Sequence, residues 1–400
     1  MTLVEANSPG GATCLTSRTE LEPAGGPQMA VAPAKFAMRN RDGGAYAYET
    51  RYLDGAPARA VLIDSKQSVL NRCEAAVAAA IDEGHPVLSR LPRIEVRYER
   101  DAAVEEYSDL TLPHRAFDGH IRAGSVDGTP VTQLEQYRAV RNATPGSARA
   151  LLDASPVTLV FGGWDSSRAT RQGRWRSILV GEIIGFCADD AATNPGLKGG
   201  ARVDPVGMKI ELTEAAMKQL ATNQRSELSG ATYDKAVKEA AKAKGGKGVS
   251  ASMLGLGGIP PTLEALAGVA CHRIVRSHVL SFAALRQLRF GAGPEGDAAC
   301  RALLAALALN ALARSDAELV LRANCDLREA GPVMVELDGR GGQVRQLDGL
   351  TIPEADALLD AALTHAEATA GVAWDGPVMH VQGNPSIVAG AVADGQDDGA

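Results

Sequence analysis

The spacing of apolar residues predicts helices in several parts of the chain. Between Val69 and Ile81 the apolar positions recur every three or four residues, with Ser65 before them as a cap and Gly84 after them as a stop. Similar patterns predict helices over Tyr233–Lys244, Asp297–Ala313 and Pro353–Ala370. The apolar run in the second of these is shorter than the roughly 18 residues that a membrane span needs, so it predicts a buried helix.

Short apolar or alternating runs predict strands. They occur at Ala60–Ile63, Ile94–Tyr98, Val157–Phe161, Ala317–Leu321 and Val333–Leu337. Because these strands alternate with helices and are interrupted by long insertions, the pattern predicts an α+β fold that carries appendages.

Changes in composition predict how the chain is divided. Residues 1–35 are rich in Gly, Pro, Ala, Ser and Thr without apolar periodicity, which predicts a disordered leader, and residues 386–400 predict an acidic disordered tail. Residues 100–155 are polar and lie between two predicted strands, as an insertion would. Residues 198–261 combine a Gly-rich start, a Lys-Ala helix and a closing glycine cluster, which predicts a mobile projection.

Composition limits the possible compartments and ligands. The 400 residues carry a formal charge of -7 and six cysteines without a C-x-x-C pair, so neither a disulfide framework nor a zinc ribbon is expected. No basic start with an apolar run marks a secretory signal, and we expect a cytoplasmic protein without membrane contact. Basic residues cluster locally, with four arginines in 158–180, five lysines in 234–247 and four arginines in 272–289. Such clusters fit an anionic ligand in a groove, although solvated faces account for them equally well.

The predicted start of the helix after Ile63 carries many polar side chains. They are Ser65, Lys66, Gln67, Ser68, Asn71 and Arg72. Free N–H groups at a helix start, beside hydroxyl, amide and cationic side chains, can hold phosphate groups. The alternative is an ordinary capped amphipathic helix, for which this polar set is larger than a cap requires.

A second polar segment mixes arginines with tryptophans. It contains Trp164, Arg168, Arg171, Arg174, Trp175 and Arg176. Guanidinium groups pair with phosphates and indoles stack on bases, so the segment is typical of single-stranded nucleic-acid binding. Trp175 could equally be a buried core residue.

Other motifs predict neither a nucleotide site nor a metal site. Gly291-Ala292-Gly293-Pro294-Glu295-Gly296 matches a dinucleotide loop in letters only, because the preceding segment has helical rather than strand spacing. The histidines are not spaced as metal ligands, so we expect neither a metal nor another cofactor. A general-base role for His114, beside Arg115, stays open.

Several short motifs together resemble a known family. In order, they are residues 63–75, 112–118, Asp204-Pro205, 258–262 and 280–290. This series resembles the CRISPR-associated RAMP proteins of the Cas-seven kind, in the type I-U (or I-G) branch. The resemblance implies a ferredoxin-like, RRM-type palm at 36–99, 156–197 and 262–385, with inserted fingers at 100–155 and a thumb at 198–261.

The same resemblance implies a role. A non-enzymatic protein would coat the backbone of a CRISPR guide RNA (crRNA) as the repeated subunit of a Cascade complex, beside copies of itself and other Cascade subunits, while the guide pairs with target DNA. Its RNA contacts would come from the helix start, from His114, Arg115 and the Trp164–Arg176 segment, and from Gly257 and Gly258. Lys235, Lys238, Lys242, Lys244 and Lys247 would belong to the thumb or to a surface for target DNA. The chain lacks the aromatic strand motif of RRM domains, so base stacking on the sheet is not expected.

Two other functions remain as alternatives. RAMP folds also include endoribonucleases that process precursor crRNA, for which His114 could be the base. A metabolic nucleotide-binding protein would use the Gly291 loop.

Overall fold

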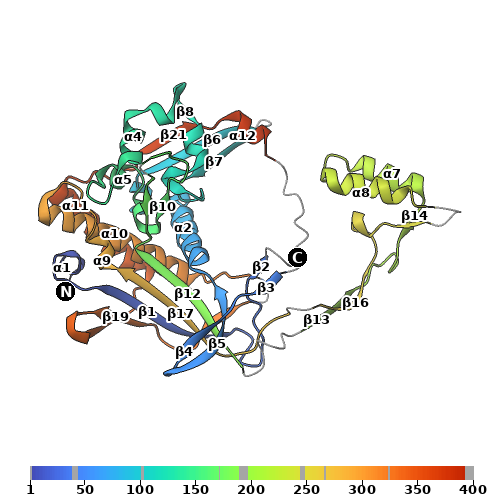
Figure 1. Ribbon diagram of the computed structural model, residues 1–400, viewed down its shortest axis with the longest axis horizontal. Coiled ribbons are helices and arrows are strands. Elements are labelled where there is room, and N and C mark those ends of the chain that lie inside the picture. The colour runs from blue at the N-terminus through green and yellow to red at the C-terminus, as the bar shows by residue number, and fades with distance from the viewer. Residues whose placement is uncertain are drawn as a thin grey trace.

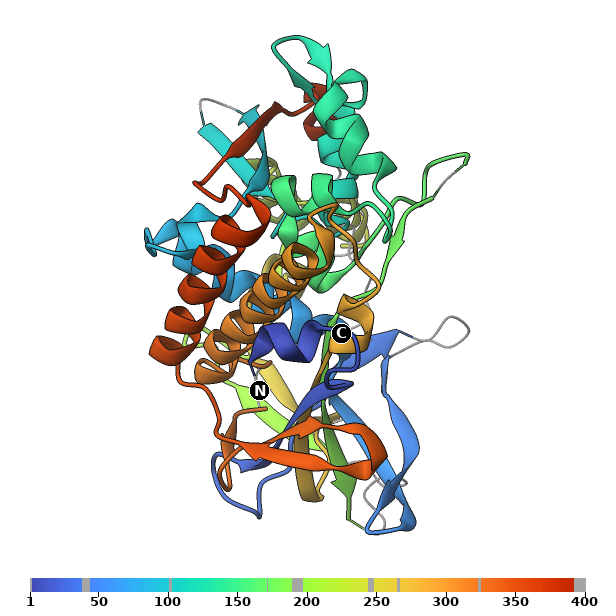
Figure 2. The same cartoon turned by 90° about the vertical axis from the view of Figure 1, so that its left-hand side faces the viewer.

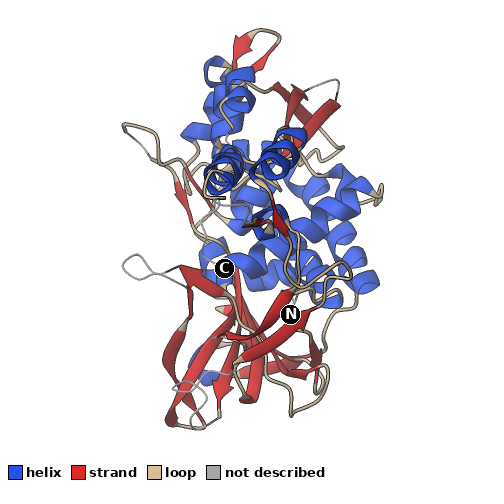
Figure 3. Cartoon of the chain, turned by 90° about the vertical axis from the view of Figure 1, so that its right-hand side faces the viewer, coloured by secondary structure: helices blue, strands red, loops and turns tan. Residues whose placement is uncertain are grey.

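The computed structural model describes residues 2–37, 44–100, 103–170, 172–188, 197–243, 248–264, 267–322 and 325–391. The fold is mixed α+β, as the sequence predicted. Figure 3 shows most helices above a large sheet, with smaller strands at the far end of the molecule.

The large sheet has eight antiparallel strands. Its order is β20 (Val344–Leu347), β19 (Met334–Asp338), β1 (Cys14–Pro23), β17 (Cys271–Ser281), β12 (Leu179–Cys187), β5 (Ala56–Asp64) and β4 (Tyr48–Leu53), and β18 (Leu327–Glu329) also pairs with β1. The strands predicted at Ala60–Ile63 and Val333–Leu337 are confirmed.

The predicted disordered leader is wrong. Strand β1 lies inside the sheet between β17 and β19, and the preceding helix α1 (Leu3–Asn7) is capped by Thr2. The inward positions of β1 include the polar residues Ser17 and Thr19, both buried. The alternation therefore contains few apolar side chains, and a search for apolar periodicity misses it.

Helices α2 (Lys66–Asp82) and α10 (Gly293–Ala317) contact each other over one face of the sheet, and α11 (Ile352–Ala370) packs on α10. Figures 1 and 2 show this helical layer. By length and composition α10 could cross a membrane, but 94% of its most apolar 18-residue window is buried inside the protein. It is a buried helix, as its sequence predicted.

Six elements form one β-α-β-β-α-β unit along the chain. In sequence they are β1, α2, β12, β17, α10 and β19, and in the sheet their strands lie in the order β19-β1-β17-β12. Residues 35–64, which contain β4 and β5, are inserted between β1 and α2 and extend the sheet beyond β12. The sheet thus joins segments from both ends of the chain.

A second lobe lies at the far end of α2. Its five-stranded sheet has the order β7 (Ala103–Ser108), β6 (Arg93–Arg100), β21 (Val378–Gln382), β8 (Ser125–Val126) and β9 (Thr129–Pro130), and β21 runs parallel to β6. Helices α3 (Gly119–Ala123), α4 (Glu135–Asn142), α5 (Arg149–Ala154), α6 (Pro156–Phe161) and α12 (Pro385–Ala389) accompany it. The predicted tail therefore begins with helix α12, whereas residues 392–400 lie outside the described residues.

Two predicted strands are wrong. Val157–Phe161 belongs to α6, whose six residues are all buried, so its apolar side chains point to every side and carry no helical period. Pro156 at its first position fits a helix start. Residues 317–321 contain the end of α10 and no strand.

A long arm projects from the body (Figure 1). Its stem pairs β13 (Lys198–Arg202) with β16 (Ile259–Glu264), and its tip holds β14 (Glu211–Leu212), β15 (Val249–Ser250), α7 (Glu214–Asn223) and α8 (Gly230–Ala240). The tip has its own small core, formed by Met217, Ala221, Ala236, Ala240 and Ala251. The helix predicted over Tyr233–Lys244 starts earlier and ends at Ala240.

The remaining elements are short. They are β2 (Lys35–Ala37), β3 (Gly44–Tyr46), β10 (Gly163–Trp164), β11 (Arg174–Trp175), α9 (Phe282–Leu285) and 3-10 turns at Leu88–Arg90, Arg115–Phe117, Val131–Gln133, Ser252–Leu254 and Arg340–Gly342.

Candidate nucleic-acid interface

The start of α2 has the expected geometry of a capped helix. Strand β5 leads directly into it, and the Ser65 hydroxyl accepts a hydrogen bond of 3.3 Å from the Ser68 N–H. Lys66, Gln67 and Asn71 are exposed beside the first turn. These three side chains are accessible to an anionic ligand.

Arg72 has a different environment from its neighbours. Its Nη1 donates to Asp64 Oδ2 at 2.6 Å, and the two side chains are only 17% and 6% exposed. Because this ion pair joins the end of β5 to α2, Arg72 stabilises the strand–helix junction. Its charge is largely matched within the protein.

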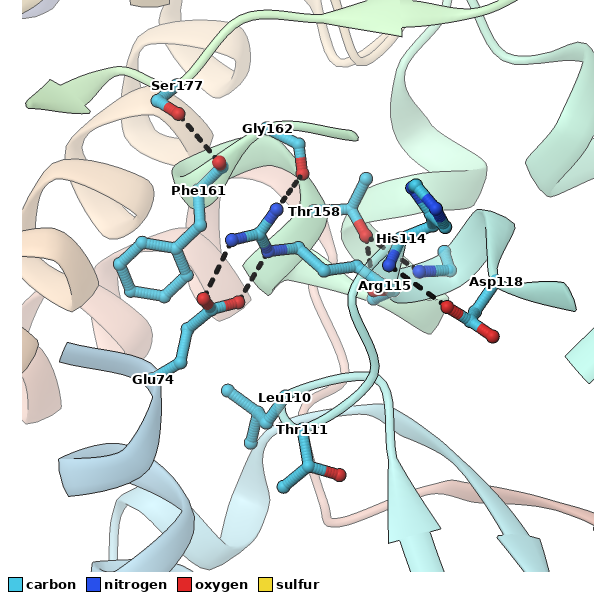
Figure 4. A network of polar contacts seen from close by, with 12 residues as sticks. Glu74, Leu110, Thr111, His114, Arg115, Asp118, Thr158, Phe161, Gly162 and Ser177 are labelled. Carbon is cyan, nitrogen blue, oxygen red and sulfur yellow. Dashed lines mark hydrogen bonds and ion pairs between the residues drawn. The ribbon is translucent and has the colours of Figure 1, made fainter. Parts of the chain in front are cut away.

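Arg115 is held in a buried network (Figure 4). Its Nη2 donates to Glu74 Oε2 at 2.7 Å, its Nη1 donates to the Gly162 carbonyl at 3.2 Å, and its Nε donates to the second oxygen of Glu74. Burial raises the pKa of Glu74, and the Arg115 guanidinium opposes that shift. Arg115, predicted as an RNA contact, thus connects α2 to the end of α6.

His114 is exposed next to this network. Its backbone N–H donates to Asp118 Oδ2 at 3.0 Å, and Asp118 also caps α3 through the His120 N–H. Within the described residues, no hydrogen bond orients the His114 imidazole. A general base normally needs such an orienting partner.

The hairpin β10–β11 presents an aromatic and a cationic side chain together. Trp164 pairs with Arg174 across the hairpin, and the Arg174 guanidinium lies 4.5 Å from the centre of the Trp164 ring. Trp164 is 43% exposed, whereas Trp175 is buried, which makes Trp175 the core residue of the two. Arg176 is exposed on the same segment.

The loop between β10 and β11 is fixed from within the protein. Arg141 forms two hydrogen bonds with Asp165, at 2.8 and 3.0 Å, and Arg168 donates to the Arg141 carbonyl and to Asn142 Oδ1. Arg168 is therefore only in part available to a ligand. Arg171 lies outside the described residues.

Three of the four arginines in the run 272–289 bind partners elsewhere in the protein, whereas Arg289 is exposed. Arg273 donates to Glu20 of β1, and buried Arg276 donates to Glu329 of β18 at 2.5 Å. Arg286 donates to two backbone carbonyls of the N-terminal segment. The matching acceptors lie far away in the sequence, so local counting of charges could not find them.

The arm contributes its own polar contacts. Lys235, Lys238 and Lys242 are exposed at its tip, whereas Lys244 and Lys247 lie outside the described residues. At its stem, the Asp204 carboxylate accepts hydrogen bonds from the N–H groups of Val206 and Gly257, which lower the pKa of Asp204. Gly257 has a φ of +96°, which favours glycine, and a Cβ on Gly258 would lie 2.7 Å from the Arg202 carbonyl oxygen. Gly257 and Gly258 therefore allow the returning chain to pack closely against Arg202 and Asp204, where the stem meets the tip.

The loop before α10 does not resemble a nucleotide site in its geometry. The N–H groups of Phe290 and Ala292 donate to Asp297 Oδ1 at 2.9 and 3.3 Å. A pyrophosphate would need free N–H groups at this position. Among the described residues, no group of three or more His, Cys, Asp or Glu side chains could hold a metal ion.

Residues 15–190 match the family model described as CRISPR-associated protein GSU0053. This part of the chain matches a CRISPR-associated protein family. The comparison with curated proteins found no match. The matched residues include the start of α2, the Arg115 network and the β10–β11 hairpin. The arm and helix α10 lie outside them.

The CRISPR association that the sequence motifs implied is therefore confirmed, and it is consistent with a RAMP-type Cascade subunit. Of the residues predicted to contact RNA, those that the described structure leaves exposed are Lys66, Gln67, Asn71, His114, Trp164, Arg174 and Arg176.

Proposed function

We propose that this CRISPR-associated protein binds the backbone of a crRNA and repeats along it as the scaffold of a type I surveillance complex, of the I-U/I-G branch. In this role it has no catalytic activity, and it assembles with copies of itself and other Cascade subunits in the cytoplasm. The guide in the complex pairs with target DNA.

The fold supports this proposal. The strand order β19-β1-β17-β12, with α2 and α10 together on one face, fits the β-α-β-β-α-β arrangement that a ferredoxin-like palm requires. In this interpretation the arm serves as the thumb and the second lobe as the fingers. We assign β1 to the proposed palm and leave out β6 and β21, because these two strands pair with each other in the second lobe.

One observation carries the RNA-binding proposal. Trp164 is exposed, and Arg174 lies over its ring, in a protein with only three tryptophans. An exposed indole offers a stacking face, and the adjacent guanidinium offers a phosphate contact, which together suit single-stranded nucleic acid. Arg176, on the same segment, adds a second cation.

The open face of the large sheet supports recognition without base reading. On this face Arg51 pairs with Glu182 at 3.0 Å and Arg273 pairs with Glu20. These paired side chains offer no ring on which a base could stack, unlike the aromatic residues of an RRM sheet. Specificity then comes from pairing of the guide with DNA, as in another class of CRISPR effector.

Binding of a fluorescent single-stranded RNA, measured by anisotropy over a range of salt concentrations, tests the proposal. We expect Trp164→Ala to weaken binding by about tenfold, because stacking contributes about 1–3 kcal/mol per base. Arg174→Ala should also make the fall of log affinity with log salt concentration less steep, by about the contribution of one phosphate contact. Arg97→Ala, an exposed arginine of the second lobe, serves as the control. Equal affinities for all three variants would contradict the proposal.

A cleavage assay with precursor crRNA separates the scaffold from the endoribonuclease alternative. We expect intact RNA, since no described side chain orients His114. Cleavage that His114→Ala abolishes would establish the enzyme instead.

A further inference from the structure

An apolar cavity of about 1290 Å³ lies between one edge of the large sheet and helices α10 and α11. Its walls include Leu15 of β1, Leu309 and Leu312 of α10, Val335 of β19, Leu347 of β20 and Leu358 of α11. Leu350, which also lines it, is 40% exposed at the mouth. This volume exceeds the roughly 300–1,000 Å³ of small-molecule pockets, so it suits a chain segment better than a small ligand.

The cavity adjoins an edge of the sheet. Strand β20 pairs with β19 on one side, and it is the last strand of the sheet on the other, among the described strands. Figure 2 shows the β19–β20 hairpin in orange below the helices. A free edge carries unpaired N–H and C=O groups, which another extended segment can bind as an added strand.

The register of β20 decides which side chains face the cavity. Leu347 lies opposite Val335, and Arg345 lies opposite Leu337. Directly opposed residues share a face of the sheet, and both β19 residues are buried on the helix side. Arg345 and Leu347 therefore stand on the cavity side of the edge strand.

The charged side chains at this edge differ in whether they have an ion-pair partner. Four charged groups that line the cavity already have partners, because Arg276 pairs with both Glu329 and Asp316, and Arg328 pairs with Glu22. A fifth, Asp348, is exposed directly after the end of β20. Arg345 is exposed, and no ion pair is found for it among the described residues. An incoming strand therefore gains most from an acidic residue opposite Arg345.

We propose that the β20 edge and this cavity bind an extended peptide segment of another protein. The segment adds to β20 as a strand, with an acidic residue opposite Arg345 and, two positions away, a large apolar residue opposite Leu347 at the cavity mouth. The proposal goes beyond RNA binding, because it uses neither Trp164 nor the start of α2.

A charge-exchange experiment tests this docking surface. The probe is a fluorescein-labelled synthetic peptide of alternating threonine and valine that carries one glutamate and one leucine two positions apart. We expect the full-length protein to bind it, and to bind about tenfold more weakly when serine replaces the leucine. Arg345→Glu should weaken binding of this peptide and strengthen binding of a matched peptide with lysine in place of glutamate.

Matched variants show whether the peptide binds at this surface or elsewhere on the protein. Leu350→Ser at the cavity mouth should weaken binding, whereas Val104→Ser should leave it unchanged, because Val104 is an exposed residue on β7 of the other sheet. RNA affinity should not change in any of these variants, so the result does not depend on the proposed RNA role. Absence of peptide binding, or a lysine peptide that gains nothing from Arg345→Glu, would overturn the proposal. Self-association of the protein that Leu350→Ser abolishes would overturn it in favour of a second copy as the occupant.

Discussion

At the scale of single residues, the ion pair between Glu74 and Arg115 is one of the contacts that join the two lobes of the body. Its side chains are 5% and 13% exposed. Removal of one partner from a buried pair leaves an uncompensated charge, so we expect Arg115→Ala to lower the free energy of unfolding by about 3 kcal/mol. The measurement is urea unfolding followed by circular dichroism.

The exposed pair Arg97–Glu106 provides the control for that measurement. Exposed pairs contribute little, so Glu106→Gln should cost less than about 1 kcal/mol. If both variants lost the same small amount, Arg115 would not have the structural role assigned to it.

Asp109 provides a pH-dependent contribution to stability. It is fully buried, and burial raises its pKa to about 7. Because the folded-state pKa lies above the unfolded value of about 3.9, the protonated carboxyl favours the native state. This stabilisation is complete below about pH 4 and is lost as the pH rises to about 7.

We therefore expect Asp109→Asn to raise the melting temperature relative to the wild type at pH 8, and to do so much less at pH 5. Asparagine carries no charge at either pH, which removes the cost of ionising a buried carboxyl. Asp348→Asn, at an exposed carboxylate, is the control and should behave alike at both pH values. A similar shift for Asp109→Asn at the two pH values would contradict the assignment.

Residue roles were the least predictable feature of the sequence. The sequence identifies Arg72 and Arg115 as candidate RNA contacts and Arg276 as a member of a basic cluster. It does not show that Asp64, Glu74 and Glu329 pair with them. Glu74 lies 41 residues from Arg115 along the chain, and Glu329 lies 53 residues from Arg276. Only the fold brings such partners together. Trp164 could be proposed as an RNA contact from the sequence, because arginines that lie near it along the chain stay near it in any fold.

At the scale of elements, the start of α2 allows helix capping and RNA binding to be tested separately. Ser65→Ala removes the side-chain cap of the helix and should cost about 1 kcal/mol in urea unfolding. Ser65→Asp keeps a capping oxygen, and its charge interacts favourably with the helix N-terminus, so stability should be preserved.

The aspartate at position 65 should nevertheless weaken RNA binding, because it places a negative charge where a phosphate would bind. Loss of affinity in Ser65→Asp without loss of stability would support the phosphate contact at this helix start. Unchanged affinity would remove the start of α2 from the RNA interface, while the Trp164 site would remain.

Element prediction succeeded where the apolar pattern is regular. Helices α2 and α11 follow helical spacing, and Ser65 and Gly84 mark the limits of α2. It failed for β1, whose inward face carries Ser17 and Thr19, and for α6, which is buried on all sides. Both failures have one cause, because a pattern of burial is visible in a sequence only when polar and apolar positions alternate with the geometry.

At the scale of the whole molecule, the order of strands in the sheet was not predictable from residue patterns alone. β1 and β17 pair although about 260 residues separate them, and β21 returns from the C-terminal part to pair with β6. The family resemblance supplied the expectation of a palm with appendages. The arm, by contrast, is visible in the sequence, since glycines, alanines and lysines replace the apolar residues of a large core between 198 and 261.

The arm should unfold independently of the body. The described part of its tip has a small core of five buried residues, and its stem is a two-stranded ribbon. Since small cores are marginally stable, we expect calorimetry of the full chain to show a minor transition for the tip at a lower temperature than the main transition of the body.

Arg202 pairs with Ile259 in the stem, so an Asn-Gly turn between them can replace residues 203–258. This deletion should abolish the minor transition, leave the main one unchanged and preserve binding of a single RNA, because Trp164 lies in the body. Met217→Asp, which disrupts the core of the tip, should also remove the minor transition alone. A single transition that both variants shift would show that the arm and body unfold together.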